Sequence, residues 1–469
     1  MLIRSASGLR GIVEDDFNSG IIDQYIASFI LTQKITHCVI GRDGRQSGRE
    51  ISQWVIDSLI KYGVNVDNCD LATTPTMQLM TEKEQYDGGI VITASHNPSE
   101  YNGLKFLQKD GTFLSPDQCN TLFVSVDNQD TLNEAEVTGK VSVYNSANEE
   151  HITKVLSAKC IEPDTIRSKK FKVVIDAVNG GGSTILPQLC SDLRCDVITI
   201  NCDGDGNFNR VAEPLAENLQ DLEKKVLEVG ADIGFATDPD GDRLSIVSNK
   251  GRAIGEEYTL VLSVMNFYRF LTFYDDKKGS ISYGELGERQ RAFNFPFKRG
   301  AVTNLSTSQM IDDFLAIYSI SSNRTKIGEA HVVENMKESN IWIGGEGNGG
   351  VILKEVHLGR DSLVAAAMVL NLLSSVEKSI NEIIAEIPEY VFVKDKITLN
   401  DTKDFDFDNL ATLFDCDEIN RDDGIKFSWS KKWIHIRKSN TEPIIRIFSE
   451  AKTESEVNDL IQTLKDYLK

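Results

Sequence analysis

The sequence predicts an α/β fold, because strand-like and helix-like segments alternate along the chain and polar loops follow the strands. Short β-branched runs that end in loops of Gly, Asp or Asn occupy residues 37–45, 89–98, 172–182, 231–243 and 341–350. A helical pattern often follows them, which favours largely parallel or mixed sheets. In such sheets ligands bind beyond the carboxyl ends of the strands, so these loops are the candidate functional sites.

Length and polar segments predict four domains. The chain has 469 residues, whereas one hydrophobic core seldom serves more than about 250–300 residues. Polar segments that could separate domains lie at residues 127–150, 249–252 and 374–389. The last unit begins with a strand-like segment near residue 390 and ends in an amphipathic helix at 454–468. The predicted domains are therefore 1–150, 151–252, 253–374 and 375–469.

Composition and charge limit the partners that the chain can have. Hydrophobic residues make up 41% of the chain and charged residues 26%, as in ordinary globular proteins. The formal net charge of −21 should repel nucleic acid and anionic membranes, so neither is an expected partner. A small anionic substrate is compatible with this charge only where basic side chains gather in one pocket.

The predicted compartment is the cytoplasm. The first residues lack the long apolar stretch of a signal peptide. The most apolar window, 363–373, is too short to span a bilayer and is expected to form a buried helix. The eight cysteines are scattered without a Cys-x-x-Cys pair, so neither a zinc site nor disulfide bonds are expected.

Three carboxylates alternate in the loop after one strand-like run, at Asp238, Asp240 and Asp242. Alternate carboxylates on a tight loop can converge on one hard cation, which requires oxygen ligands. An EF-hand is excluded, because its glycine and glutamate positions hold Arg243 and Asn249 here. The alternative is a solvated acidic turn. A second Asp/Asn run at 203–209 is a weaker candidate for metal binding.

A serine lies where another predicted strand ends, in Thr93-Ala-Ser-His-Asn-Pro98. Such a junction can present the hydroxyl of Ser95 as a nucleophile. A serine hydrolase is disfavoured, because no Gly-x-Ser-x-Gly elbow surrounds Ser95 and adjacent residues rarely orient as nucleophile and base. We expect His96 to support the loop by hydrogen bonding, and a purely structural turn is the alternative.

Two further loops carry groups that could hold a ligand. Residues 345–350 satisfy G-x-G-x-x-G, but a strand-like run follows them where a dinucleotide site would open a helix. Their glycines would instead let the backbone approach a ligand, with Glu346 and Asn348 bonding to hydroxyls. The segment 437–443 combines Arg437 with hydroxyl and amide donors, a set that binds a phosphate dianion. An ordinary polar turn is the alternative for this segment.

Together these motifs resemble the α-D-phosphohexomutases, a family that includes phosphoglucomutase, phosphomannomutase and phosphoglucosamine mutase. The resemblance runs over nearly the whole chain, through residues 5–11, 93–98 with 101–105, 238–243, 345–350 and 437–443. It implies three similar mixed-sheet α/β domains and a smaller C-terminal α+β domain around a central cleft. The four domains would supply the phosphoserine, metal, sugar and phosphate loops in that order.

The resemblance also implies an isomerase that interconverts hexose 6-phosphate and hexose 1-phosphate. Phosphorylated Ser95 would donate its phosphoryl group to form a hexose 1,6-bisphosphate, which serves as intermediate and activator. Phosphoryl transfer needs charge neutralisation and in-line positioning more than covalent help. The partner is therefore a small sugar phosphate, bound by a monomer or homodimer.

The family pattern assigns roles to individual residues. Mg²⁺ would be bound by Ser95, Asp238, Asp240 and Asp242, and the catalytic group would be Ser95, Arg10, Lys105 and His96. The substrate would contact Arg243, Glu329, Glu346, Asn348, Arg437, Ser439, Asn440 and Thr441. The last four would clamp the non-reacting phosphate of either end in turn.

Departures from the family pattern bear on the acid/base group and the substrate. Many bacterial relatives have His at the position of Gly350. This sequence has Gly there and His357-Leu-Gly-Arg-Asp361 downstream, a combination that resembles an archaeal and Bacteroidetes variant. The identity of the general acid/base is therefore open. Glu329 resembles the acidic residue of phosphoglucosamine mutases and would favour an amino group at C2. Alternatives are a simple ion pair of Glu329, a phosphomannomutase/phosphoglucomutase, a Mg²⁺-dependent sugar phosphatase and an inactive sugar-phosphate-binding relative.

Overall fold

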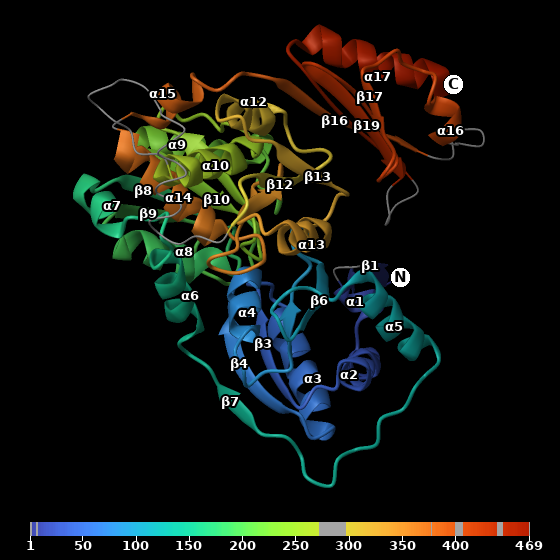
Figure 1. Cartoon of the computed structure of the whole chain (residues 1–469). Helices are drawn as coiled ribbons and strands as arrows, with labels where there is room; N and C mark the ends of the chain where they lie inside the picture. The colour runs from blue at the N-terminus through green and yellow to red at the C-terminus, as the bar shows by residue number, and fades with distance from the viewer. Residues whose placement is uncertain are drawn as a thin grey trace.

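Four β-sheets organise the part of the chain that the computed structural model describes, which is residues 2–5, 8–271, 297–376, 378–398, 407–438 and 444–468 (Figure 1). The first sheet lies in the lower part of Figure 1, the next two lie together above it, and the last stands apart near the C-terminus. The predicted α/β class with mixed sheets is confirmed.

The N-terminal domain holds a seven-stranded sheet in the order β1-β2-β6-β5-β3-β4-β7. Its strands are β1 (Ile3–Ser5), β2 (Gly8–Ile12), β3 (His37–Arg42), β4 (Asn65–Leu71), β5 (Gly88–Ile92), β6 (Tyr101–Gln108) and β7 (Val141–Val143). Its helices are α1 (Val13–Asp16), α2 (Ser19–Gln33), α3 (Gly48–Lys61), α4 (Thr74–Thr81) and α5 (Pro116–Asp127). Local chemistry fixes where helices begin: Thr73 caps α4, and Ser115 with Gln118 forms a capping box on α5.

The second sheet has four strands in the order β11-β10-β8-β9. The elements of this part of the chain are α6 (Ala147–Leu156), α7 (Pro163–Lys169), β8 (Lys172–Asp176), α8 (Gly182–Asp192), β9 (Asp196–Ile200), the 3₁₀ turn η1 (Ala216–Asn218), α9 (Gln220–Val229), β10 (Ile233–Thr237) and β11 (Leu244–Ser248). All five residues of β10 are buried, which explains why the strand reads as a continuous apolar run rather than an alternating one.

The third sheet has the order β13-β12-β14-β15. Its elements are α10 (Glu257–Leu271), β12 (Ala301–Asn304), α12 (Met310–Ile317), β13 (Ser322–Thr325), α13 (Glu329–Ser339), β14 (Ile343–Glu346), β15 (Gly350–Leu353) and α14 (Ser362–Val376). Helix α14 contains the apolar window 363–373, and all the residues of that window are buried, as the sequence predicted. It packs on α10 and α7, so the second and third sheets share one hydrophobic core.

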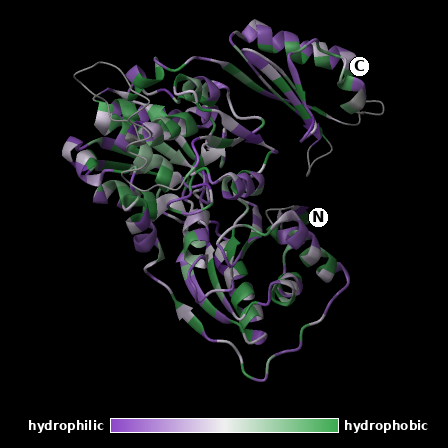
Figure 2. Ribbon diagram, in the orientation of Figure 1, coloured by the Kyte–Doolittle hydropathy of each residue, from purple (hydrophilic) through white to green (hydrophobic). Residues whose placement is uncertain are grey.

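The C-terminal domain has an antiparallel five-stranded sheet in the order β16-β20-β19-β18-β17. Helix α15 (Ile380–Ile384) packs in the core of the second and third sheets. The elements of the C-terminal domain are β16 (Val391–Thr398), α16 (Phe407–Leu410), β17 (Glu418–Asn420), β18 (Ile425–Trp429), β19 (Lys432–Lys438), β20 (Ile444–Ala451) and α17 (Glu454–Leu468). The colours of α17 alternate in Figure 2, because Val457, Leu460, Ile461 and Leu464 lie on its one buried face. Among the described residues no helix is long and apolar enough to cross a membrane.

One arrangement recurs in the first three sheets. Three parallel strands (β4, β3 and β5; β9, β8 and β10; β13, β12 and β14) are followed by one antiparallel strand, which is β6, β11 or β15. The third parallel strand of each set therefore leads into a hairpin. After β5 and β10 this differs from the helix that often follows such runs, whereas the strand expected after residues 345–350 is confirmed. The hairpins place three equivalent loops at the carboxyl ends of β5, β10 and β14.

Candidate active site

The three hairpin loops carry the residues that the sequence singled out. Ser95 follows β5, the aspartates 238–242 follow β10, and Glu346 ends β14. Hydrogen bonds across the domains join these loops, since Ser95 Oγ lies 3.4 Å from Asp238 Oδ2. The loops therefore meet at one place, although they are far apart in the sequence.

Ser95 is held in an uncommon backbone conformation. Its φ is +52°, in the left-handed region that costs a non-glycine residue about 1 kcal/mol or more. Its N–H donates to Thr93 Oγ1 at 2.8 Å, and Arg45 donates to the carbonyl oxygens of Ser95 and Asn97 at 2.7 and 2.6 Å. The Arg45 side chain is itself buried and ion-paired with Asp43. This support fixes the direction of the Ser95 hydroxyl.

His96 lies beside this hydroxyl, with Nδ1 3.4 Å from Ser95 Oγ. Burial lowers the pKa of His96 well below its ordinary value, and the neighbouring cations Arg243 and Arg10 lower it further. The imidazole is therefore neutral at physiological pH. The structure places His96 where it can support the loop or accept a proton from the serine.

Each aspartate of the triplet has one oxygen held by hydrogen bonds from the protein, and the second oxygen of Asp238 accepts from Ser95 Oγ. Asp238 Oδ1 accepts the N–H groups of Asp242 and Arg243, at 3.2 and 3.3 Å. Asp240 Oδ2 accepts from Thr74 Oγ1 and Lys105 Nζ, both at 2.6 Å. The remaining carboxylate, Asp242, accepts from an arginine on another element, Arg360 Nη2, at 2.5 Å.

The other oxygens of the triplet form the candidate metal centre. Asp240 Oδ1 and Asp242 Oδ1 are buried without a hydrogen-bond partner. The carboxylate oxygens of Asp238, Asp240 and Asp242 approach within 4.8 Å of one another. Burial raises the pKa of Asp238 well above its usual range, and repulsion from Asp242 and Asp240 adds to this rise. A hard divalent cation fits this oxygen set, because it would pair the orphaned oxygens and relieve the repulsion.

Basic side chains surround the serine and the triplet, as the acidic composition requires for an anionic substrate. Arg10 Nη1 donates to Asn97 Oδ1 at 3.0 Å, on the loop that carries Ser95. Lys105 lies on β6 and contacts the triplet through Asp240. Arg243 is buried and lies 3.7 Å from Asp242 through Nε. The positive charge missing from the surface is thus concentrated here.

The loop 346–350, which is predicted to bind the sugar, is held by hydrogen bonds from its own side chains and from neighbouring segments. Glu346 Oε1 accepts from Asn304 Nδ2 at 2.8 Å and from the N–H of Gly328 at 3.0 Å. Asn348 Nδ2 donates to Glu346 Oε2 at 3.4 Å, and Asn348 Oδ1 accepts the N–H of Gly350. Because β15 follows this loop directly, the structure confirms a hairpin rather than the helix of a dinucleotide site.

Glu329 begins α13 and is buried among polar partners. Its Oε1 accepts from Gln78 Nε2 and its Oε2 accepts from Arg360 Nε, both at 3.0 Å. Burial raises the pKa of Glu329, although Arg360 opposes that rise. Arg360 is therefore the basic partner that the alternative interpretation, a simple ion pair of Glu329, requires. The part of Glu329 in substrate choice stays a prediction.

The predicted phosphate clamp is described only in part. Arg437 is the second-last residue of β19, and its Nε lies 3.4 Å from Asp423 Oδ1. Asp423 also accepts the N–H of Ile327 at 3.1 Å, which connects this region of the C-terminal domain to the loop before Glu329. Ser439, Asn440 and Thr441 lie outside the described residues.

Two residues that the sequence reasoning missed belong to the site. Arg360 contacts Asp242 and Glu329, and Arg45 holds the serine loop. Both are buried arginines in short polar segments, 42–45 and 357–361, next to an apolar run. Buried charges need partners, so an arginine between an apolar run and a helix start was the available signal.

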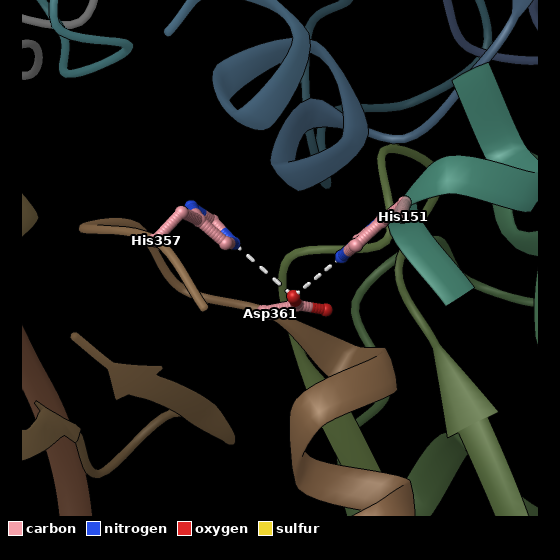
Figure 3. Close-up of side chains that lie close together, drawn as sticks. All are labelled: His151, His357 and Asp361. Atoms are coloured by element: carbon pink, nitrogen blue, oxygen red, sulfur yellow. Dashed lines mark hydrogen bonds and ion pairs between the residues drawn. The ribbon is translucent and has the colours of Figure 1, made fainter. Parts of the chain in front are cut away.

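A second buried group lies behind the site (Figure 3). His151 Nε2 and His357 Nε2 both point to Asp361 Oδ2, at 2.8 and 3.1 Å. Burial alone would raise the pKa of Asp361, but the two imidazoles hold this pKa well below its usual range. An ionised carboxylate only accepts, so both Nε2 atoms carry protons, and His151 Nδ1 faces Thr76 Oγ1 at 2.9 Å. The group joins α4, α6 and the segment before α14, and His357 Nδ1 is its one ring nitrogen without a hydrogen-bond partner.

We expect Asp361→Ala to destabilise the protein by about 3–5 kcal/mol. The change leaves two buried imidazole N–H groups without an acceptor and removes the oxygen that caps α14 through the N–H groups of Leu363 and Val364. Calorimetry should show a melting temperature lower by about 6–20 °C. Asp361→Asn keeps the capping oxygen and should cost less, and equal melting temperatures for the Ala variant and the wild type would contradict this role.

Comparison with known proteins places this site in a family. Profiles described as phosphoglucomutase/phosphomannomutase alpha/beta/alpha domains I, II and III match residues 1–133, 149–251 and 287–390. The profile of the C-terminal domain matches 393–466. The fold and the site define an α-D-phosphohexomutase, an isomerase that moves a phosphoryl group within a sugar phosphate. The chain belongs to the phosphoglucomutase/phosphomannomutase family.

Relatives and solved structures share the whole architecture. A phosphoglucomutase/phosphomannomutase of Thermococcus kodakarensis is 33% identical over 90% of this chain and 88% of its own. A phosphoglucosamine/phosphogalactosamine mutase of Sulfurisphaera tokodaii is 29% identical over 98% of this chain and 97% of its own. A structure of a family protein from Burkholderia thailandensis has a TM-score of 0.80 at 22% identity, covering 99% and 97% of the two chains. The N-acetylphosphoglucosamine mutase of Aspergillus fumigatus, solved with GlcNAc-6P and magnesium, has the same fold at a TM-score of 0.57 and 14% identity, covering 100% and 96%.

Proposed function

We propose that the protein interconverts glucosamine 6-phosphate and glucosamine 1-phosphate through a phosphoserine at Ser95. The observation that supports this most is the contact of Ser95 Oγ with a carboxylate triplet that has two orphaned oxygens. Phosphorylated Ser95 donates its phosphoryl group to a sugar hydroxyl, whose proton leaves to a base, and a hexose 1,6-bisphosphate forms. The other phosphate of this intermediate then returns to Ser95 Oγ and releases the product.

Each group around Ser95 has a proposed part in this transfer. Asp238, Asp240 and Asp242 would hold Mg²⁺, which neutralises charge on the transferring group when bound. Arg10, Lys105 and Arg243 supply further positive charge, while His96 supports the serine and is a candidate for the base. Glu346 and Asn348 bind sugar hydroxyls. Arg437, with Ser439, Asn440 and Thr441, binds the phosphate that is not reacting.

The amino sugar is the finer part of the proposal. Relatives named phosphoglucosamine mutase, such as that of Methanococcus vannielii at 31% identity, support it. The relative from Thermococcus kodakarensis bears the other family name, so phosphomannomutase/phosphoglucomutase is the second candidate. A carboxylate at Glu329 would attract the protonated 2-amino group, although its charge is shared with Arg360.

Substrate choice is tested by kcat/KM for the phosphates of glucosamine, glucose and mannose. The ratio of glucosamine to glucose phosphate should exceed one in the wild type, because the buried carboxylate favours a cation over a hydroxyl. Glu329→Gln should lower this ratio about tenfold, which corresponds to roughly 1.4 kcal/mol.

The matched control is Glu334→Gln, an exposed glutamate of the same helix. It should leave the ratio unchanged. Preference of the wild type for mannose phosphate would overturn the choice of substrate, and steady release of inorganic phosphate would indicate a phosphatase instead of a mutase.

A further inference from the structure

Arg360 joins three carboxylates that belong to different loops of the site. Its Nη2 lies 2.5 Å from Asp242 Oδ2, its Nη1 lies 2.6 Å from Glu346 Oε2, and its Nε lies 3.0 Å from Glu329 Oε2. The guanidinium is buried, as are all three carboxylates. One planar cation thus links the loop after β10 with the loop after β14 and the start of α13.

The contact with Asp242 determines which of its oxygens is available. Arg360 occupies Oδ2, and Oδ1 is buried without a hydrogen-bond partner, with Arg243 Nε 3.7 Å away. Lys105 and Thr74 do the same for Asp240, whose Oδ1 is likewise unpartnered. Groups that orient a metal ligand in this way usually change metal affinity about 10–100-fold when they are lost.

The contact with Glu346 reaches the sugar loop. Because Glu346 Oε2 also accepts from Asn348, the position of the guanidinium bears on both side chains that are expected to hold sugar hydroxyls. A rotation of Arg360 toward Asp242 would move the guanidinium away from Glu346, and a rotation toward Glu346 would move it away from Asp242. The two loops therefore cannot rearrange independently.

Gly350 provides the space for this arginine. A Cβ at position 350 would lie 2.2 Å from Arg360 Cδ and 2.8 Å from Arg360 Cγ. Both atoms belong to the stem of the side chain, whose terminal group is held by three ion pairs. A methyl group at position 350 would thus displace the guanidinium while leaving the residue in place.

We propose that Arg360 is a positioning residue that couples the binding of the divalent cation to the binding of the sugar phosphate. The inference rests on the proposed function, since it takes the triplet as the metal centre and the loop 346–348 as the sugar site. A purely structural ion-pair network, the alternative, would contribute to stability but not to the linkage between two ligands.

The experiment measures Mg²⁺ affinity by isothermal titration, with and without saturating glucosamine 6-phosphate. The dephosphorylated full-length protein is used, because it has no phosphoryl group to donate. We expect the sugar phosphate to tighten Mg²⁺ binding in the wild type by a factor within about 5–150. In Arg360→Lys that factor should fall at least fivefold, and Mg²⁺ alone should bind about tenfold more weakly. Direct attraction between Mg²⁺ and the phosphate persists in both proteins.

Gly350→Ala tests the same linkage without removing the arginine. It should reduce the coupling factor as Arg360→Lys does, and the double variant should show little further loss. The matched control, Arg167→Lys, changes the arginine of an ion pair on α7 far from the loops and should leave the factor unchanged. If Arg360→Lys does not fold, the coupling factor of Gly350→Ala tests the inference.

Two outcomes separate the inference from the function on which it rests. If the variants melt at a lower temperature but keep the coupling factor of the wild type, the inference is overturned and Arg360 has a structural role. A wild-type protein that binds neither Mg²⁺ nor glucosamine 6-phosphate would instead overturn the proposed function.

Discussion

Replacing Ser95 with Ala should reduce mutase turnover by at least about four orders of magnitude, since the covalent step has no substitute. The structure adds a reason why no neighbouring hydroxyl can take over. The Ser95 hydroxyl is directed by a left-handed backbone that Arg45 and Thr93 hold in place. Of the two other hydroxyls between β5 and β6, that of Thr93 already donates to Asp43 at 2.6 Å and that of Ser99 belongs to an exposed residue.

The measurement combines a coupled mutase assay with peptide mass analysis. Part of the wild-type sample should carry one phosphate on the peptide that contains Ser95, and the Ala variant should carry none there. Ser142→Ala, on the exposed strand β7, is the control and should keep wild-type turnover. A Ser95→Ala variant with normal turnover would remove Ser95 from the reaction.

The functional loops could be predicted from the sequence because their chemistry is local. The aspartates 238–242 alternate within one tight turn, and Ser95 directly follows an apolar run, so short segments carried both signals. The buried helix α14 was predictable for the same reason, since its apolar window has no interruption except Asn371. The structure of a single helix or loop depends mainly on residues that are close in the sequence, so a short segment is enough to predict it.

The partners of Arg360 could not be predicted, because they are remote in the sequence. The residue that Arg360 holds most closely, Asp242, is 118 positions away in the sequence, and no periodicity of 357–361 indicates that contact. The hairpins after β5 and β10 were missed for a related reason, whereas the strand after residues 345–350 was predicted from its own apolar run. A short strand buried between other strands reads like the start of a buried helix, and only the sheet order distinguishes the two.

Asp240→Asn should lower turnover by about three orders of magnitude, the loss of ~4 kcal/mol of transition-state stabilisation. The substitution is nearly isosteric, so the fold should survive. Burial would raise the pKa of Asp240. Ion pairing with Lys105 opposes this, together with hydrogen bonds from Lys105 and Thr74, and the pKa stays below its usual range. Asp240 is therefore ionised, and the neutral amide removes one negative charge from the candidate metal centre.

The same change leaves Lys105 without its carboxylate partner at 2.6 Å, so a second effect must be separated from metal binding. Lys105→Met keeps all three aspartates and removes one of the cations that face them, while Arg243 and Arg360 remain. If the triplet holds Mg²⁺, Asp240→Asn should raise the Mg²⁺ concentration needed for half-maximal activity by more than Lys105→Met does, because Lys105 only orients Asp240 whereas Asp240 itself would bind the metal. Exhaustive chelation should abolish the activity of the wild type, and Mg²⁺ should restore it. Full activity after chelation would show that the triplet serves the reaction without a metal.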